Sequence, residues 1–220
     1  MVLFSLILIL LIWQSQTGEE ATLNQTAEGT KAVVVLDPGH GGFDPGKVGT
    51  KGTLEKDINL AIAKKVEKLL ADNGYVVSMT RTEDMALCSG NESSKKLTDM
   101  KNRVAFIEKA DPVLAVSIHQ NSFSAGTKGA QVFYYTGSEE GKKLANIIQG
   151  SIRDAVGDDN HRVEKANDSY YMLRKVSCPL VIVECGFLSN PEEETLLCDQ
   201  KYQEKMARGI CEGIENFLYK

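Results

Sequence analysis

Short aliphatic runs alternate with longer amphipathic segments along most of the chain. Apolar runs bounded by Gly, Pro or Asn indicate buried strands, whereas apolar residues spaced three and four apart indicate helices. The alternation of strands with helices predicts a single α/β domain, with a mostly parallel, twisted sheet of about six strands and helices on both faces. The segments predicted from this pattern are strand 33–37, helix 55–73, strand 75–80, helix 97–109, strand 113–118, strand 130–135, helix 138–156, strand 181–184 and helix 201–218.

The N-terminal part of the chain has a different pattern. Residues 2–13 form an almost uninterrupted apolar run, about as long as a signal-peptide core and shorter than the ~20 residues that span a bilayer. We expect an exported protein with a signal or anchor segment and linker at 1–30 and one folded domain at 31–220. No Lys or Arg precedes the run and no A-x-A site follows it, so cleavage, membrane tethering through residues 2–13 and a misplaced start codon remain open.

Size and charge narrow the class of protein. The chain has 220 residues, of which 42% are hydrophobic, enough for one substantial α/β core and too few for two. A net charge of -5 gives no global basic footprint for nucleic acid, which we therefore do not expect as a partner, although it leaves local basic patches open. Contact with a membrane is expected only through residues 2–13.

The five cysteines give no signal for a zinc ribbon or a disulfide framework, because their number is odd and no C-x-x-C spacing occurs. We expect them to be small hydrophobic residues. Cys185 is a separate case because a thiol beside a reactive group can be a nucleophile. Since side chains alternate along a strand, Cys185 should point away from any site that Glu184 faces.

Polar side chains follow three predicted strands at the point where each strand ends. His40 comes after VVVLDPG, His119 comes directly after strand 113–118, and Glu184 comes directly after Leu-Val-Ile-Val. Glu55 opens the helix that follows the His40 loop. Ligands of open α/β sheets bind at the carboxyl ends of the strands, so we expect these four side chains to meet at that edge.

The chemistry of these four residues indicates a hydrolytic zinc site. Two imidazoles and one carboxylate, here His40, His119 and Glu55, are the ligand set of many catalytic zinc sites, with the fourth position left to water. Glu184 is a further carboxylate at the end of an apolar strand, where burial is unfavourable unless charge or hydrogen bonds compensate for it. A carboxylate that takes the proton of a metal-bound water is sufficient machinery for hydrolysing an amide.

Four sequence blocks then carry a family resemblance. In chain order they are VVVLDPGHGG, LEKDINLAIA, SIHQNS and VIVECGFLSNPEEE. Together they resemble the zinc-dependent N-acetylmuramoyl-L-alanine amidases of the Amidase_3 family, over residues 33–219. The resemblance implies that His40, Glu55 and His119 bind one zinc ion and that Glu184 is the catalytic carboxylate. It also implies cleavage of the amide between N-acetylmuramic acid and L-alanine of the peptidoglycan stem.

Within that family, the segments KKLTDMKNRVAFIEKADPVLAVSIHQNS and SNPEEETLLCDQKYQEKMARGI are most similar to germination-specific amidases of the spore cortex. This closer resemblance implies a role in cortex maturation, in which a deacetylase completes the formation of muramic-δ-lactam. The expected partners are peptidoglycan glycan strands with peptide stems and a sporulation partner protein. The expected location is the cell wall or the space between the forespore membranes.

Several side chains have two interpretations. Arg103 is a candidate for binding a substrate carboxylate, and a structural ion pair is its alternative. Asn121 follows His119 by two residues, so strand alternation would place it on the same side, where it could orient substrate. Tyr170 and Tyr171 could line a sugar or peptide cleft or simply be half-buried aromatics. His161 lies in a polar run and is expected to be a solvated loop residue and not a ligand.

Two other functions fit the same residues. A zinc carboxypeptidase that cuts within the peptide stem would use the same ligand set, but it would release a terminal amino acid instead of a whole stem. A non-catalytic glycan-binding domain could keep the fold, although retention of His40, Glu55, His119 and Glu184 together argues against it.

Overall fold

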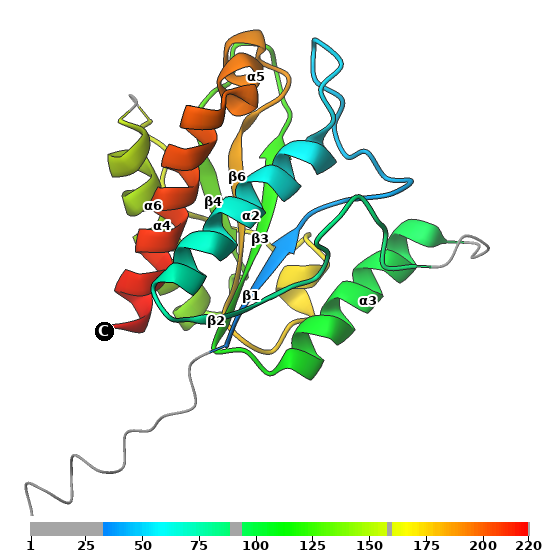
Figure 1. Cartoon of the computed structure of the whole chain (residues 1–220), viewed down its shortest axis with the longest axis vertical. Coiled ribbons are helices and arrows are strands. Elements are labelled where there is room, and N and C mark those ends of the chain that lie inside the picture. The colour runs from blue at the N-terminus through cyan, green and yellow to red at the C-terminus, as the bar shows by residue number, and fades with distance from the viewer. Residues whose placement is uncertain (1–32, 89–93, 158–159, 220) are drawn as a thin grey trace, which may run out of the picture. The chain divides into compact units, whose positions relative to one another are not determined.

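The computed structural model describes residues 33–88, 94–157 and 160–219 (Figure 1). The predicted signal or anchor segment, the linker and the predicted domain start at Lys31 lie outside these residues. Within the described part of the chain, no helix is both long enough and apolar enough to cross a bilayer.

Six strands form one sheet in the order β2-β1-β3-β6-β4-β5. Strands β2, β1, β3 and β6 run parallel to one another, and β4 runs antiparallel to β6, so the predicted α/β fold with a mostly parallel sheet is confirmed. The elements in chain order are β1 (Val33–Pro38), α2 (Glu55–Asp72), β2 (Val76–Met79), α3 (Lys95–Ala110), β3 (Leu114–Asn121), β4 (Gln131–Tyr134), α4 (Glu139–Val156), β5 (Lys165–Ala166), the 3-10 helix η1 (Met172–Arg174), β6 (Leu180–Phe187), α5 (Pro191–Cys198) and α6 (Gln200–Leu218).

Helices cover both faces of the sheet (Figure 1). The larger core lies on the face covered by α2, α4 and α6, whose buried residues recur at the spacing of one helical face. The smaller core lies on the opposite face, where Ile107 of α3 and Met172 and Leu173 of η1 pack against alternate residues of β1, β3, β4 and β6. Because strand side chains alternate, each central strand contributes to both cores.

Three short elements were not predicted. Strand β5 has two residues and η1 has three, which is too short for any period to show. Helix α5 has eight residues, PEEETLLC, with apolar side chains only near its end, so its helical period is hidden. Its start follows local rules: Asn190 caps the helix by accepting from the N–H groups of Glu192 and Glu193, and Pro191 occupies the first turn.

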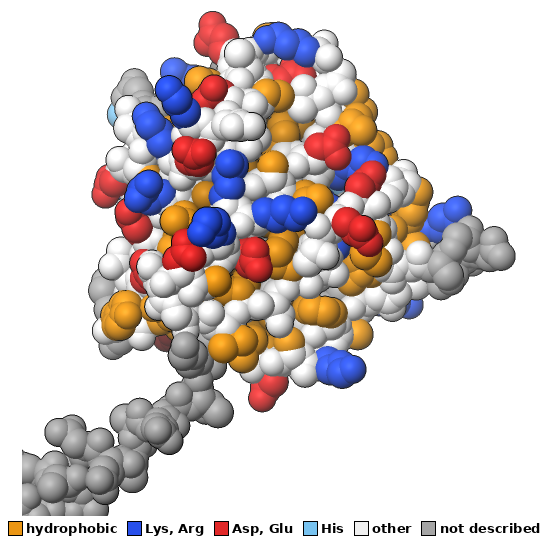
Figure 2. All heavy atoms as spheres, viewed as in Figure 1, with side chains coloured by type: hydrophobic (Ala, Val, Ile, Leu, Met, Phe, Trp, Pro, Cys, Tyr) orange, Lys and Arg blue, Asp and Glu red, His pale blue; other side chains and the backbone are white. Residues whose placement is uncertain are grey.

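Acidic and basic side chains are interspersed on the face of the molecule shown in Figure 2, with hydrophobic side chains between them. The ion pair between Lys65 and Glu204, at 3.8 Å, joins α2 to α6, and the pair between Lys68 and Asp72, at 2.8 Å, lies within α2. Exposed pairs of this kind contribute about 0–1 kcal/mol each. The packing of α2 against α6 therefore depends on the apolar side chains beneath these charges.

Candidate metal centre and active site

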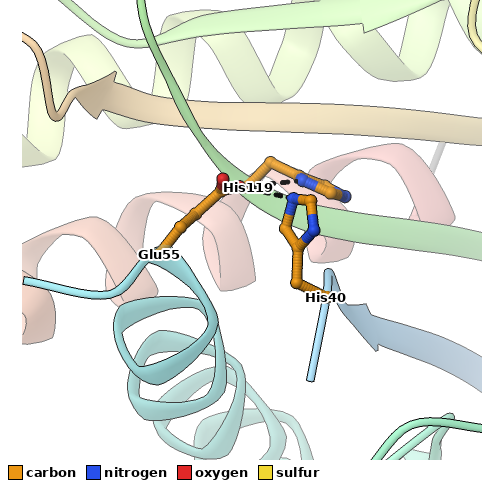
Figure 3. A group of neighbouring side chains, drawn as sticks. All are labelled: His40, Glu55 and His119. Carbon is orange, nitrogen blue, oxygen red and sulfur yellow. Dashed lines mark hydrogen bonds and ion pairs between the residues drawn. The ribbon is translucent and has the colours of Figure 1, made fainter. Parts of the chain in front are cut away.

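His40, Glu55 and His119 converge at the carboxyl edge of the sheet (Figure 3). His40 lies in the loop after β1, Glu55 is the first residue of α2, and His119 lies near the end of β3. One ligand atom from each lies within 4.8 Å of the others, and the two imidazole rings meet edge to face at 4.9 Å between centroids. The three residues that the sequence proposed as metal ligands therefore form one group.

The Glu55 carboxylate bridges the two imidazoles. Its Oε1 atom lies 3.2 Å from Nε2 of His40 and 3.0 Å from Nδ1 of His119, and only 3% of the residue is exposed. The backbone N–H of Gln120 donates to Oε1 at 3.0 Å, and that of Lys47 donates to Oε2 at 2.7 Å. Burial alone would raise the pKa of Glu55, but the two imidazoles outweigh it and hold the pKa far below its usual value. The site therefore holds a buried negative charge between two imidazoles.

The loop after β1 presents His40 in an unusual backbone conformation. His40 has a φ of 61°, in the left-handed region that non-glycine residues rarely adopt. Its Nδ1 atom lies 2.9 Å from Oδ2 of Asp44, whose other oxygen lies 2.9 Å from Nζ of Lys96 on α3. Asp44 therefore directs Nε2 of His40 towards Glu55. Sequence reasoning missed Asp44, although a carboxylate four residues after the histidine, in Gly-Phe-Asp-Pro-Gly, was an available signal.

Glu184 lies on β6, opposite His119 in the parallel pairing of β3 with β6. The residue is 7% exposed, its Oε1 atom accepts from the hydroxyl of Tyr170 at 3.4 Å, and its Oε2 atom has no hydrogen-bond partner in the described structure. Burial, assisted by the charge of Glu55, raises the pKa of Glu184 to about 7. Its neighbour Cys185 is fully buried in the larger core, which confirms that this thiol faces away from the site.

A pocket opens beside these groups on the face of the sheet that α3 covers. Tyr170 and Tyr171 line it, as one of their two interpretations predicted, together with His40, His119 and Glu184. Asp44 and Met100 complete the side nearest α3. Both imidazoles and Glu184 thus border one cavity that is open to substrate.

Arg103 is among the residues that line the pocket, although only 2% of it is exposed. Its Nε atom donates to Asp99 at 2.6 Å, and one terminal nitrogen donates to Asp37 at 2.6 Å and to the carbonyl of Pro38 at 2.9 Å. The other terminal nitrogen donates to the carbonyl of His40 at 2.6 Å. These contacts agree with a structural ion pair, the second interpretation of Arg103, because four of its N–H groups donate to atoms of the protein itself. Arg103 holds the His40 loop through the carbonyls of Pro38 and His40, and substrate binding by Arg103 stays a prediction.

Asp37 is the buried charge that compensates Arg103. It is fully buried and also accepts from the hydroxyls of Thr80 and Ser117 at 2.6 Å each. Burial by itself would raise the pKa of Asp37, but Arg103 and the two hydroxyls outweigh it and lower the pKa to about 2. Asp37 therefore stays ionised, and the pair links β1 to α3 directly below the site.

We expect Asp37→Asn to lower the free energy of unfolding by up to about 3–5 kcal/mol, because it removes the more deeply buried of the two carboxylates that pair with Arg103 and leaves only Asp99. The matched control is Asp72→Asn, which removes an exposed pair with Lys68 and should change stability by less than about 1 kcal/mol. Denaturant unfolding followed by circular dichroism measures both. Equal effects of the two changes would show that the buried pair does not stabilise the fold.

The loss of stability caused by Asp37→Asn should depend on pH. Asp37 has a lower pKa in the folded protein, about 2, than the ordinary aspartate value of 3.8, so its contribution to stability is fully present above about pH 4. The contribution is lost as the pH falls towards 2. The difference in stability between the native protein and Asp37→Asn should therefore narrow between about pH 4 and pH 2, and a difference that widens there would contradict the assignment.

The structure gives less support to two other sequence candidates, Asn121 and His161. A bulge shifts the register between His119 and Asn121, so the strict alternation behind the Asn121 prediction is interrupted. The Asn121 side chain accepts from the N–H of Ser122 at 2.7 Å, and Asn121 is not among the residues that line the described pocket. Substrate binding by Asn121 stays a prediction. His161 is an exposed loop residue, as expected, and lies outside the metal group.

The acidic run after β6 anchors the loops around the site, a role that sequence reasoning missed. The carboxylate of Glu193 accepts from the N–H of Gly129 at 2.8 Å and of Phe187 at 2.7 Å. Glu194 is buried and accepts from the N–H of Lys51 at 3.0 Å and from the hydroxyl of Thr50. This second carboxylate fixes the loop that leads into Glu55.

Comparisons with known proteins agree with this geometry. A germination-specific N-acetylmuramoyl-L-alanine amidase of Bacillus subtilis (strain 168) is 39% identical over 190 residues, which are 84% of this chain and 79% of the relative. The CwlD amidase of Clostridioides difficile, solved in complex with the GerS lipoprotein, superposes with a TM-score of 0.83 at 38% identity over 86% of this chain and 99% of that one.

A second solved structure, the catalytic domain of the amidase CwlV from Bacillus (Paenibacillus) polymyxa, superposes with a TM-score of 0.75 at 34% identity over 86% of this chain and 99% of that one. The family model for N-acetylmuramoyl-L-alanine amidase, Amidase_3, matches residues 34–216, which include every strand-end residue of the site. The fold, the pairing of His119 with Glu184 and this match agree, and the chain belongs to the Amidase_3 family of N-acetylmuramoyl-L-alanine amidases.

Proposed function

We propose that this protein uses one zinc ion, held by His40, Glu55 and His119, to hydrolyse the amide between N-acetylmuramic acid and L-alanine of the peptidoglycan stem. The observation that carries the proposal is a buried carboxylate between two imidazoles, with a second buried carboxylate across the strand pair. Family membership supports the bond that is cleaved.

The side chains fit zinc in type and in placement. Two imidazole nitrogens and one carboxylate oxygen lie within 4.8 Å of one another, and zinc accepts this donor set. Glu55 is held ionised, the form that a metal ligand needs. When bound, zinc supplies a Lewis acid that lowers the pKa of water towards ~7 and polarises a carbonyl.

Glu184 moves the proton in the proposed reaction. Oε2 of Glu184, which has no partner in the described structure, takes a proton from the attacking water as the bond from oxygen to the lactyl carbonyl carbon forms. The same carboxyl group then gives that proton to the L-alanine nitrogen as the carbon–nitrogen bond breaks. In the protein without metal, burial raises the pKa of Glu184 to about 7, and a carboxyl group with a raised pKa can accept a proton and release it again.

Mass spectrometry of peptidoglycan fragments, after incubation with the purified protein with and without zinc, tests the proposal. We expect whole peptide stems with a new L-alanine amino terminus, formed only with zinc. Release of single terminal amino acids would identify a carboxypeptidase instead. Binding of glycan without any new fragment would identify a non-catalytic binding domain.

Gly39 tests whether the orientation of His119 matters for the metal. A Cβ atom at position 39 would collide with the imidazole of His119, so Gly39→Ala should displace that ring. We expect zinc affinity to fall about ten- to hundredfold, the range found when groups that orient a ligand are changed. Zinc titration against a competing chelator measures it. Gly150→Ala on α4, where a Cβ meets open space, should bind zinc like the native protein, and equal affinity in both variants would argue against His119 as a ligand.

We also propose a narrow role for the protein in maturation of the spore cortex. The similarity to a germination-specific amidase and to CwlD supports this role. We propose that residues 31–220 are the exported catalytic domain and that residues 1–30 deliver it, as a cleaved signal or as a tether, to the space between the forespore membranes or to the cell wall. A sporulation protein is the proposed partner, since the similar CwlD was solved with a lipoprotein.

The cortex composition distinguishes this role from general lysis of the wall. Deletion of the gene in a spore former should remove muramic-δ-lactam from the cortex, because lactam formation requires a muramic acid whose peptide has been released. Complementation with the native gene should restore the lactam. Unaltered lactam content in the deletion strain would reject the cortex role while leaving the amidase activity in place.

A further inference from the structure

The carboxylate of the proposed base, Glu184, has few hydrogen-bond partners. Glu184 is 7% exposed, and its Oε1 atom accepts a hydrogen bond from the Tyr170 hydroxyl at 3.4 Å. Oε2 has no partner in the described part of the chain. The terminal torsion of a glutamate is broad, so a carboxylate without donors can rotate and exchange its two oxygens. A single fixed donor on one oxygen determines which oxygen is left for the reaction.

Tyr170 is itself firmly placed. The backbone N–H of Asn167 donates to the carbonyl of Tyr134 on β4 at 2.8 Å, and the Asn167 side chain accepts from the N–H of Tyr170 at 3.0 Å. The Tyr170 ring packs edge to face on Phe133 of β4, with centroids 5.6 Å apart. These contacts fix the Tyr170 ring against β4, the strand next to β6. Tyr170 also lines the same pocket as Glu184.

We infer that Tyr170 is a positioning residue for the amide hydrolysis, whose hydroxyl holds Oε1 of Glu184 and leaves Oε2 directed at the attacking water. The inference rests on the proposed function. Burial, with the charge of Glu184 next in size, raises the pKa of Tyr170 to about 12, so the phenol keeps its proton and remains a donor throughout the cycle. The sequence indicated Tyr170 as a residue lining a cleft or as a half-buried aromatic, and the hydroxyl contact was missed because it joins residues fourteen apart across a loop.

Tyr170→Phe removes the donor and keeps the ring on Phe133. We expect kcat to fall about tenfold, the size of effect for one hydrogen bond to a charged group, with KM, zinc content and thermal midpoint close to those of the native protein. The control is Tyr134→Phe, the same chemical change on β4 in a half-buried residue that packs on the larger core outside the pocket. A raised KM with unchanged kcat, or native kcat in Tyr170→Phe, would overturn the inference.

A double-mutant cycle separates positioning of Glu184 from a direct contact with substrate. If Tyr170 acts through Glu184, Tyr170→Phe should change turnover little once Glu184→Gln has removed the base. A full tenfold further loss in the double variant would instead show an independent role. Turnover of the native protein with zinc is measured first, so failure of the amidase proposal is seen separately from failure of this inference.

A measurement without turnover completes the test. Carbon NMR of zinc-free protein with tyrosine labelled at Cζ reports the environment of each phenol, and the Tyr170 resonance is the one lost in Tyr170→Phe. Glu184→Gln should shift that resonance and leave the Tyr134 resonance in place. A Tyr170 resonance that does not respond to Glu184→Gln would show that the hydroxyl does not contact the carboxylate, and it would reject the inference.

Discussion

Glu184→Gln is expected to reduce turnover at least about a hundredfold while the protein keeps its fold and its zinc. The amide of glutamine has nearly the shape of the carboxylate but cannot take a proton from water, and general acid–base assistance is typically worth ~10² to 10⁴ in rate. The structure favours this role because Glu184 lies outside the group of three residues close enough to share an ion. Its Oε2 atom is buried without a partner beside that group.

Two measurements on the same variant decide between the possible roles of Glu184. Steady-state release of peptide stems gives turnover, and elemental analysis gives the zinc content. Loss of zinc would make Glu184 a ligand, and near-native turnover with zinc bound would make it a structural residue. Glu140→Gln is the matched control, because Glu140 is an exposed residue of α4 far along the chain from the site, and it should change neither quantity.

The fold and the four main site residues could be predicted because they depend on local pattern. Central strands of a parallel sheet are buried on both faces, so they are continuous apolar runs, and a His or Glu directly after such a run is conspicuous. The rule that parallel strands bring their carboxyl ends to one edge then placed His40, His119 and Glu184 together before any distance was known. The alternation of side chains along β6 also predicted that Cys185 faces the core, which the structure confirms.

The supporting residues could not be predicted in the same way because their roles depend on tertiary contacts. Glu194 holds the loop before Glu55 from a helix more than a hundred residues later in the chain, and nothing in Pro-Glu-Glu-Glu indicates that contact. Arg103 and Asp37 are sixty-six residues apart, so a buried pair and a substrate-binding arginine look alike in the sequence. The bulge after His119 likewise arises from the pairing of two strands, and it interrupted the alternation used for Asn121.

His119→Ala is expected to abolish stoichiometric zinc binding. Removing this imidazole leaves two of the three protein ligands, and it also removes a partner that lies 3.0 Å from the buried Glu55 carboxylate. The loss of affinity should exceed the ~10- to 100-fold that changes around a ligand cause, because a ligand atom itself is lost. His40→Ala and Glu55→Ala should behave in the same way, since each supplies one of the three donors.

The chain contains a natural control for this experiment. His161 is an exposed loop histidine outside the metal group, so His161→Ala removes the same kind of side chain and should leave the zinc content unchanged. Elemental analysis of both variants after dialysis gives the stoichiometry, and circular dichroism confirms that each is folded. Full zinc in His119→Ala would contradict the ligand assignment. Zinc lost equally from both variants would show that binding in solution is not confined to the edge of the sheet where His40, Glu55 and His119 meet.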